Sequence, residues 1–562
     1  MSYALSSGVT GLKAHQKMLD VAGNNLANVN TTAFKSSSMS FSELLGQTIK
    51  DATQPNGPIG GTNPMQMGAG VEVSSITPNT SQGSIVNTGN PLDMAIEGEG
   101  YFVVASSEGP LYTRAGMFGV DQSGFLVDPA TGFRVQRMGL TGESDGFQIT
   151  GDSSLRIPYD VALPAQSTSQ VTITGNVSSD ATPVAQAQVL MSNVAYTHND
   201  GTDASDTTEI DQLDQFSGGS GANGELAAAE TGTITIAGYD SDGTALSSGL
   251  TFAVTNTTTL ADLIDHLNTN VLNGATASLV NGKVRVADDE TGYSKSDISL
   301  SYSGVGSLEM PAYFEIPTAG GDEVKNINIA VFDSLGGKHV LSAALVRTDA
   351  INTWDLILTS MTGNVSEIDM DNRRINGISF DPETGAYAGL PLDETAELSV
   401  TFDHDTAHPQ TIAMDFGTVG AFDGLTQFAG SSTAVARDQD GYDAGSLSTV
   451  SVNNQGVLIG AFSNGIKKDL AMLQIALFNN PAGLQSMGGG YSTSSANSGG
   501  AVAVQALTAG AGSVQGGALE KSNADVATEF VTLIQAQNGF QANARTITVA
   551  NQILQELTSL IR

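Results

Sequence analysis

Residues 5–30 read LSSGVTGLKAHQKMLDVAGNNLANVN, and residues 526–561 read VATEFVTLIQAQNGFQANARTITVANQILQELTSLI. In both stretches apolar residues recur at alternating spacings of four and three, which is the seam pattern of a coiled coil. A chain that can pair its two ends in this way is organised like the subunit of a filament. The seam residues that we expect to pack subunits together are Leu5, Val9, Leu12, Leu19, Leu26, Val526, Phe530, Leu533, Phe540, Ile547, Leu554 and Ile561.

Both helices are diluted by Gly, Asn, Gln and Thr, so neither is expected to be stable alone in water. The last helix opens with Ser522-Asn523-Ala524-Asp525, which resembles a capping box. We expect the Ser522 hydroxyl to accept from a free backbone N–H and Asp525 to lie at the positive end of the helix dipole. An amphipathic helix is more often the core of its own domain, and that alternative stays open for each stretch taken singly.

The charge balance is strongly acidic, with Asp+Glu 58 against Lys+Arg 22 in 562 residues and a formal net charge of −36. Such a shortage of cations argues against nucleic acid and anionic membranes as partners. The chain has no Cys, which excludes disulfides and thiolate chemistry. The N-terminus lacks a basic segment followed by an apolar run, and no stretch of about 18 apolar residues exists. We expect no membrane insertion and either a cytoplasmic protein or export without a cleaved signal peptide.

The interior is punctuated by Gly, Asn and Asp roughly every 8–12 residues, which is the rhythm of antiparallel β-structure. The predicted fold is a mainly β multidomain protein with paired N- and C-terminal α-helices forming a coiled-coil-like inner domain, and one inserted α+β outer module. The expected segments are 1–35 (N-terminal helix of the inner core domain), 36–70 (extended connector), 71–145 (first part of a β-domain), 146–230 (first part of an outer β-domain), 231–302 (inserted outer module), 303–430 (second part of the outer β-domain), 431–485 (second part of the β-domain), 486–517 (Gly/Ser-rich connector) and 518–562 (C-terminal helix of the inner core domain).

Few residues suggest chemistry. His404 and His408, with Asp403 and Asp405, form the densest group of metal-type ligands, but Pro409 favours a turn in which they would be exposed. The Asp-rich loop 199–211 looks superficially like a calcium loop and lacks the Glu that should close it. No phosphate-binding glycine loop is present, and nothing marks out one Ser as a nucleophile, although a Ser/His/Asp triad stays possible. We expect no catalytic residue, metal or cofactor.

Several phrases, in order, resemble the bacterial flagellar hook protein, a member of the rod and hook axial protein family. Residues 27–35 (ANVNTTAFK) are similar to the family's N-terminal signature, with Ala33 where the family usually has Gly. Residues 88–102, 332–339 and 517–527, and the lone Trp354, continue the resemblance. The residues that carry the terminal motifs are Ala27, Asn28, Thr31, Phe34, Ser522, Asn523 and Asp525.

The resemblance implies a structural subunit that polymerises into a curved hollow tube, the universal joint that transmits motor torque from rod to filament. It implies an extracellular hook location after export by the flagellar type III apparatus. The implied partners are other copies of the chain, the distal rod protein, the hook cap, the hook–filament junction protein and the export apparatus. The segment 231–302 is similar to a flagellin-type module. A Cys–Lys crosslink, which joins hook subunits in some spirochaete relatives, is excluded because Cys is absent.

Other interpretations remain. Within the class, the chain could be a distal-rod or hook-like accessory protein, which its length and residues 333–336 oppose. Outside the class, it could be a surface adhesin or S-layer-type protein, which would need a signal peptide or an anchor. An enzyme would depend on the His404/His408 group alone.

Overall fold

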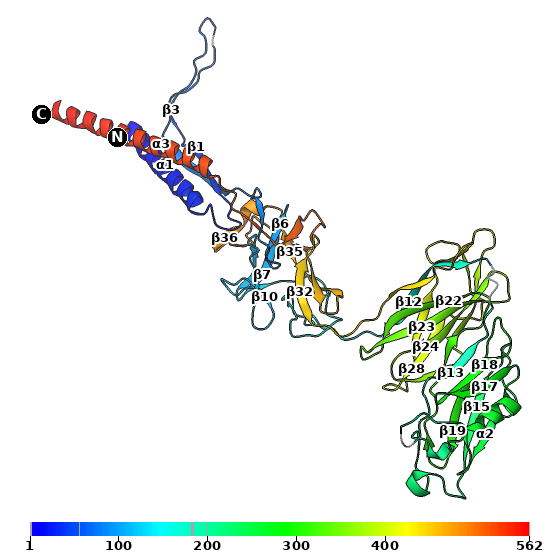
Figure 1. Cartoon of the computed structure of the whole chain (residues 1–562). Coiled ribbons are helices and arrows are strands. Elements are labelled where there is room, and N and C mark those ends of the chain that lie inside the picture. The colour runs from blue at the N-terminus through cyan, green and yellow to red at the C-terminus, as the bar shows by residue number, and fades with distance from the viewer. Residues whose placement is uncertain (1–2, 56, 181–184, 199–200, 561–562) are drawn as a thin grey trace. The chain divides into compact units, whose positions relative to one another are not determined.

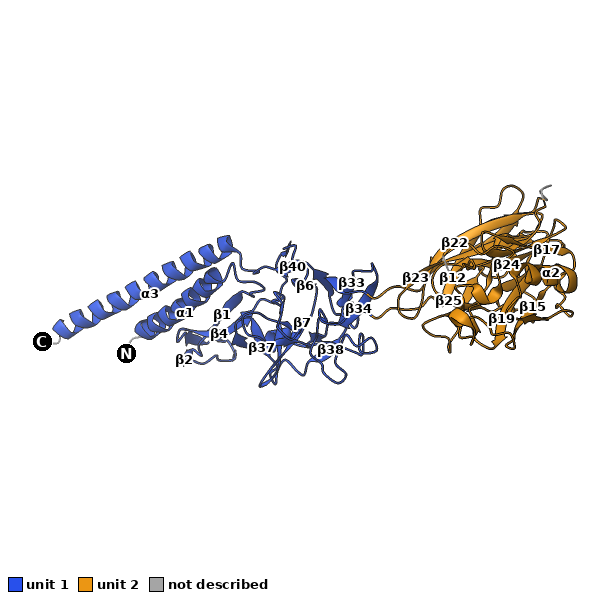
Figure 2. Cartoon of the chain, turned by 60° about the horizontal axis from the view of Figure 1, so that its bottom comes forward, with its two compact units in different colours: residues 1–163, 445–562 blue, residues 164–444 orange. Residues whose placement is uncertain are grey.

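The computed structural model describes residues 3–55, 57–180, 185–198 and 201–560. The chain divides into two compact units (Figure 2): unit 1 contains residues 1–163 and 445–562, and unit 2 contains residues 164–444. Both ends of the chain therefore belong to the same unit. No helix in the described ranges is long and apolar enough to cross a membrane.

Unit 1 begins and ends with long helices, α1 (Tyr3–Ala27) and α3 (Val526–Leu560), which lie side by side (Figure 1). The stretch after α1, expected as an extended connector, instead folds back on itself as antiparallel ribbon strands. Ser40 pairs with Ser75 in the first pair, and Gln47 with Met67 in the second. The ribbon strands are β1 (Ser37–Glu43), β2 (Gln47–Lys50), β3 (Met65–Met67) and β4 (Val71–Pro78).

The β-structure of unit 1 combines residues from both halves of the chain. Its largest sheet runs in the order β36-β37-β8-β7-β11-β10-β9, and β35, which also pairs with β38, joins β7. The Gly/Ser-rich passage expected as a connector supplies strands to this sheet, and smaller ladders pair β6 with β39 and β5 with β40. The strands are β5 (Ile85–Asn87), β6 (Met94–Glu97), β7 (Tyr101–Ser106), β8 (Gly109–Thr113), β9 (Gly119–Val120), β10 (Leu126–Val127), β11 (Arg134–Val135), β32 (Leu447–Val452), β33 (Val457–Phe462), β34 (Lys467–Met472), β35 (Ile475–Leu477), β36 (Gln485–Gly488), β37 (Tyr491–Thr493), β38 (Val502–Val504), β39 (Ser513–Gly516) and β40 (Ala518–Glu520).

Unit 2 is built from packed sheets, and its described residues contain one α-helix, α2. Its sheets run β25-β28-β29-β12-β30 with β31 beside β12, β22-β23-β24-β26-β27, β17-β18-β13-β21, β16-β15-β19 and β14-β20. Its elements are β12 (Gln170–Ser178), β13 (Val189–Ser192), β14 (Phe216–Ser217), β15 (Gly232–Tyr239), β16 (Thr251–Val254), α2 (Leu260–His266), β17 (Ala275–Val280), β18 (Lys283–Asp288), β19 (Asp297–Gly304), β20 (Ser307–Leu308), β21 (Phe314–Thr318), β22 (Val324–Phe332), β23 (Lys338–Arg347), β24 (Thr353–Met361), β25 (Val365–Ile368), β26 (Arg374–Phe380), β27 (Tyr387–Gly389), β28 (Glu397–Phe402), β29 (Gln410–Asp415), β30 (Leu425–Phe428) and β31 (Val435–Gln439).

The sheet containing β23 and β24 separates two hydrophobic clusters. Leu345 on one face joins a cluster around Trp354, which is fully buried, whereas Ala344 and Val346 on the other face join a cluster formed by residues 190–319. Successive side chains of a strand point to opposite faces, so a sheet covered on both sides needs a nearly continuous apolar run. The run from residue 340 to 346 meets that need.

Strand pairing extends the region around residues 231–302 beyond the boundaries expected from the sequence. β18 pairs with β13, which lies before that segment, and β13 pairs with β21, which lies after it. Gln186 and Gly321 bridge each other, so the chain enters and leaves this region at one point. The short helix α2 begins after Thr259, whose side chain forms a capping box with Asp262.

Candidate assembly surface

The contact between α1 and α3 is made by small residues. A Cβ atom added at Gly8 would lie 3.1 Å from Cγ1 of Ile547, and one at Gly11 would lie 2.6 Å from Oδ1 of Asn543. On α3, a Cβ at Gly539 would lie 2.5 Å from Cε1 of His15. Glycine therefore lets the two backbones approach closely, as small residues do at tight helix crossings. The buried residues of α1 are Gly8, Gly11, Ala14, Ala22 and Asn25.

The expected seam residues flank this contact. Val9 is 37 % exposed, and the side chains that lie deepest on α3 include Ala536 at 0 % exposure. The spacing of Gly8, Gly11 and Ala14 is the sequence signal that reasoning from apolar residues alone missed. Of the expected seam, the half-buried residues are Leu5, Leu12, Leu19, Leu26, Leu533, Phe540 and Ile547, the exposed ones are Val9, Val526, Phe530 and Leu554, and Ile561 lies outside the described residues.

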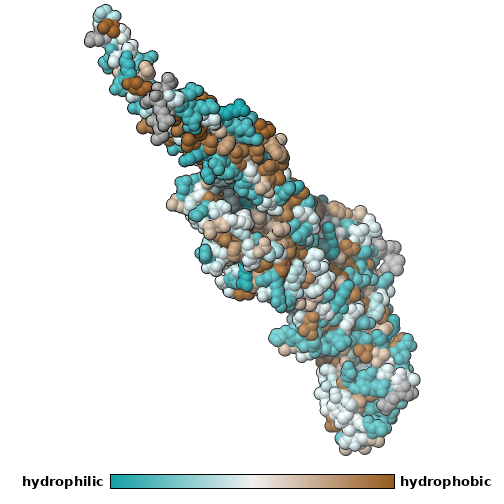
Figure 3. Space-filling view, turned by 90° about the vertical axis from the view of Figure 1, so that its left-hand side faces the viewer, coloured by the Kyte–Doolittle hydropathy of each residue, from teal (hydrophilic) through white to brown (hydrophobic). Residues whose placement is uncertain are grey.

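Helix α3 carries a large apolar surface that the subunit itself does not cover. Figure 3 shows apolar side chains in brown among polar ones at the helical end of the chain. Exposed apolar residues gathered on one element of a soluble protein often mark an interaction site, so α3 is a candidate interface. The exposed large apolar residues of α3, each between 40 % and 59 % accessible, are Val526, Phe530, Val531, Ile534, Val549, Ile553, Leu554 and Leu557.

Asn25 and Asn523 fasten the helices to the ribbon. Asn25 Nδ2 donates to Ser37 O and to Glu529 Oε1, both at 2.9 Å, and Asn25 Oδ1 accepts from Ser37 N. Asn523 Oδ1 accepts from Ser36 N at 2.8 Å, while its Nδ2 donates to the carbonyls of residues 79 and 81. Asn25 therefore joins segments 504 positions apart, and Asn523 joins segments 442 to 487 positions apart.

The N-terminal motif forms the turn that ends α1. Asn28 Oδ1 accepts from the Thr31 hydroxyl, and the Phe34 backbone N–H donates to Thr31 O. Ala33 adopts a left-handed conformation with φ of 56°, and its N–H donates to Glu520 O at 2.8 Å. Ala27 is the last residue of α1.

The cap of α3 differs from the one expected from the sequence. The carboxylate of Asp525 accepts from the backbone N–H groups of Ala527 and Thr528, both at 3.2 Å. Hydrogen bonds from the Thr528 hydroxyl and from these N–H groups lower the pKa of Asp525. Ser522 accepts from Ala524 N instead, because the helix begins three residues later than the Ser522 cap required.

A buried ion cluster lies where the segment before α3 joins the β-structure. Glu520, 1 % exposed, pairs with Lys35 at 2.6 Å and with Arg114 at 3.6 Å, and it also accepts from Gly83 N. Burial lowers the pKa of Lys35, although the hydrogen bond to Glu520 opposes that effect. The cluster holds together four segments that the sequence keeps far apart.

The metal-type ligands of unit 2 do not converge on a common point. His408 Nδ1 lies 2.9 Å from Asp405 Oδ1, whereas His404 Nε2 lies 3.1 Å from the Ser334 hydroxyl. Among the described residues, no group of three or more His, Asp or Glu is arranged to hold a metal ion. In the Asp-rich loop, Asp200 lies outside the described residues, and buried Asp211 accepts from Leu226 N.

Ser334 and His404 also raise the possibility of a catalytic triad with Asp333. Asp333 Oδ2 lies 3.9 Å from His404 Nδ1, which is longer than a hydrogen bond, and accepts from His339 Nε2 at 2.9 Å. At 3.9 Å, Asp333 does not hydrogen-bond to His404, so it does not orient the ring as the carboxylate of a triad does.

Comparison with known proteins places the chain in a family. Over 565 residues it is 30 % identical to the flagellar hook protein FlgE of Borreliella burgdorferi, with all of both chains covered. The chain belongs to the flagellar hook protein family. It is also 31 % identical to the hook protein of Treponema pallidum over the full length of both, and 26 % identical to that of Escherichia coli over 99 % of this chain and 100 % of that one.

Family models match four parts of this hook-family chain. Residues 5–35 match the flagella basal body rod protein, and residues 515–560 the C-terminal part of the rod proteins FlgEFG. Residues 95–179 match the FlgE/F/G D1 domain, and residues 311–442 the FlaE D2 domain. The first range covers α1 from Leu5 onward, the second contains α3, and the segment 180–310 lies between the last two.

Two further comparisons are with a rod protein and with a solved structure. The basal-body rod protein FlgG of Bacillus subtilis is 37 % identical but aligns with only 32 % of this chain, which disfavours a rod protein as the alternative. Among solved structures, the crystal structure of Helicobacter pylori flagellar hook protein FlgE2 matches with a TM-score of 0.40 and 18 % identity, over 76 % of this chain and 99 % of that one.

Proposed function

We propose that this hook-family structural subunit polymerises with copies of itself through α1 and α3 into the curved tube that joins rod to filament. One observation carries the proposal: eight large apolar residues are exposed in the described part of α3, while α1 contacts it through glycines. Burying such a surface is the main favourable term in association. In a homopolymer, a neighbouring copy of the chain covers the exposed apolar residues of α3.

In the polymer, the paired helices form a coiled-coil-like inner layer, and the β-structure lies outside it. Polar residues within the helix contact, such as Asn25 and Asn543, fix register at some cost in stability. The subunit must shorten and lengthen as a curved tube rotates, and polar, hydrated contacts between outer domains permit that sliding. The acidic, Ser- and Thr-rich surface of unit 2 suits such contacts.

The proposed partners besides other copies are the distal rod protein, the hook cap, the hook–filament junction protein and the type III export apparatus. The absence of Cys suits export of an unfolded chain, because no disulfide can form on the way. The region bounded by Gln186 and Gly321 is proposed as an outer module inserted into the second domain. No catalytic role is proposed, since the family is structural.

The assembly surface is tested by Ile534→Glu and Ile553→Glu, which place carboxylates on the apolar face of α3. In cells lacking their own hook protein, we expect each variant to be exported but to form no hooks visible by electron microscopy. The matched control is Leu140→Glu, since Leu140 is 76 % exposed in a loop of unit 1 that follows β11. Normal hooks from both α3 variants would refute the proposal.

Location is tested separately with gold-labelled antibody against residues 231–302 on purified hook–basal bodies. Gold along the curved segment would support both the hook assignment and an outer position for the module. Gold confined to the rod or the filament junction would instead favour an accessory protein.

A further inference from the structure

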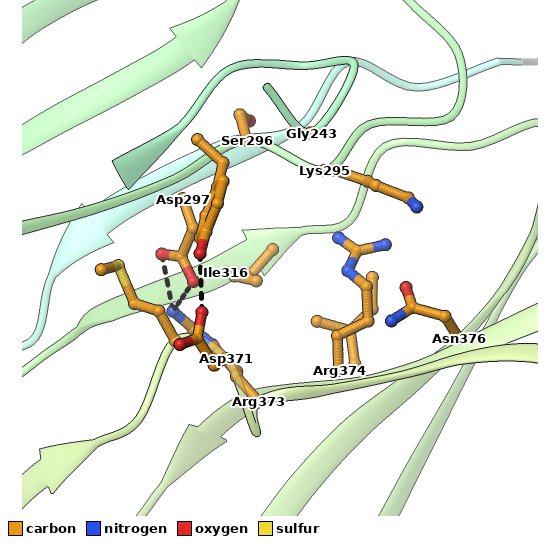
Figure 4. Close-up of a pocket in the computed structure, with 12 residues that line it drawn as sticks. Gly243, Lys295, Ser296, Asp297, Ile316, Asp371, Arg373, Arg374 and Asn376 are labelled. Carbon is orange, nitrogen blue, oxygen red and sulfur yellow. Dashed lines mark hydrogen bonds and ion pairs between the residues drawn. The ribbon is translucent and has the colours of Figure 1, made fainter. Parts of the chain in front are cut away.

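Unit 2 contains a cavity of about 210 Å³ between the outer strands and the sheet beneath them (Figure 4). Tyr239 at the end of β15 and Lys295 just before β19 line one wall, and the segment leading into β26 lines the other. Ile316 and Ile357 are buried and give the cavity an apolar floor. This volume is smaller than a site for a drug-sized molecule and suits a ligand the size of one sugar ring.

The charges on one side of the cavity are already satisfied. Arg373, 2 % exposed, donates to both oxygens of Asp297 at 3.0 and 3.2 Å and to the carbonyl of Leu358. Asp371 accepts from the Tyr239 hydroxyl at 2.6 Å. These groups hold the two walls together.

The polar groups on the other side of the cavity can make further hydrogen bonds or ion pairs. Figure 4 shows Lys295, Arg374 and Asn376 gathered there, apart from the Asp297–Arg373 pair. The Lys295 ammonium group lies 5.9 Å from the centre of the Tyr293 ring. Arg374 reaches Asp355 through a single contact of 3.4 Å and donates its other terminal nitrogen to Ser294 O.

Asn376 supplies an acceptor that nothing uses. Its Nδ2 donates to Glu394 at 3.0 Å, which fixes the orientation of the amide, and its Oδ1 is buried without a hydrogen-bond partner among the described residues. A buried acceptor without a partner costs free energy, so its presence beside a cavity points to an absent donor.

We propose that this cavity binds a small hydroxylated carboxylate of the sugar-acid class. The ligand carboxylate lies between Lys295 and Arg374, where two cations of a chain with net charge −36 converge. A ligand hydroxyl donates to Asn376 Oδ1, and the ring covers Ile316 and Ile357. Because the two walls come from different sheets, bound ligand also bridges the outer strands to the sheet beneath.

The test is calorimetric titration of the full-length chain with sodium glucuronate, with glucose and sodium sulfate as parallel probes. We expect glucuronate to bind, glucose to bind at least about tenfold more weakly, and Lys295→Ala to weaken glucuronate by about tenfold, as expected for loss of one charge-assisted hydrogen bond. Lys338→Ala, which removes an exposed lysine on β23, is the matched control and should leave the affinity unchanged.

Circular dichroism establishes that both variants are folded, since Lys295 is only half-buried. The proposal is overturned if glucuronate does not bind, if Lys295→Ala binds it as tightly as the parent chain, or if sulfate or glucose binds equally well. Binding that is lost equally in Lys338→Ala also overturns it.

Discussion

At the scale of single residues, a few side chains decide how distant segments meet. Ala33 stands where the family signature usually has Gly, and its backbone has a positive φ of 56°. Left-handed backbone brings Cβ of an L-residue too close to the following carbonyl oxygen, whereas glycine adopts it freely. The turn after α1 therefore contains a strained residue, Ala33.

Replacing Ala33 with Gly should stabilise unit 1 by about 1 kcal/mol, because the relief of strain exceeds the extra entropy of the unfolded glycine. Urea unfolding followed by circular dichroism measures the change. Gly89→Ala is the converse control, since Gly89 has φ of 73° and open space around it, and it should be destabilising. A lower unfolding midpoint in Ala33→Gly would contradict the strain.

The buried cluster around Glu520 makes a second prediction. Glu520→Gln leaves Lys35 and Arg114 without their carboxylate, and breaking a buried pair in this way costs about 3 kcal/mol. The urea midpoint of unit 1 should fall accordingly. Glu99→Gln, at an exposed carboxylate, should leave it unchanged, and equal effects of the two changes would refute the assignment.

The environment of Asp333 predicts that the stability of unit 2 depends on pH in the acid range. Burial alone would raise its pKa, but hydrogen bonds from His339 and from the backbone of Gly337 and Leu335 outweigh that effect and lower it. A lowered carboxyl pKa contributes stability above the unfolded-state value of about 3.9, and that contribution is lost as the pH falls toward the folded-state value. Thermal unfolding between pH 6 and pH 2 should therefore be less pH-dependent in Asp333→Asn than in the parent chain. Parallel curves would contradict this linkage.

At the scale of elements, the helices were predictable because a four-three spacing sustained over 25 residues or more has few other solutions. The face through which the two helices contact each other was not predictable from this spacing. Gly8 and Gly11 are invisible to a search for apolar stripes, yet they permit the closest approach. The helix cap is Asp525, whereas the sequence suggested Ser522. The local sequence offers both residues as caps, and Asn523, which lies between them, hydrogen-bonds to the ribbon.

Gly11→Leu should separate α1 from α3, because overpacking a close helix contact costs about 1–3 kcal/mol. Hydrogen exchange of α3 amides in the purified subunit measures the loss of protection. Gly23→Leu is the matched control on the same helix, since a Cβ there meets nothing within 4 Å. Equal exchange in the two variants would refute the glycine contact.

At the scale of the whole molecule, strand pairing joins the segment 231–302 to strands on both sides of it in the sequence. Deleting 231–302 removes β17 and β18 from the sheet that they share with β13 and β21, and uncovers Ala344 and Val346. The thermal midpoint of unit 2 should fall by several degrees, with unit 1 unaffected. An unchanged midpoint would show that 231–302 is a self-contained module.

Local patterns along the chain predicted the terminal helices, the β-rich interior and the hook-family motifs, because periodicity and turn residues are local properties. The folded structure was needed to learn which helix faces meet, that the Gly- and Ser-rich connectors pair as strands, and that Glu520, Lys35 and Arg114 share one buried cluster. These features depend on residues hundreds of positions apart, and their pairing is set by burial and hydrogen bonding that no local pattern records.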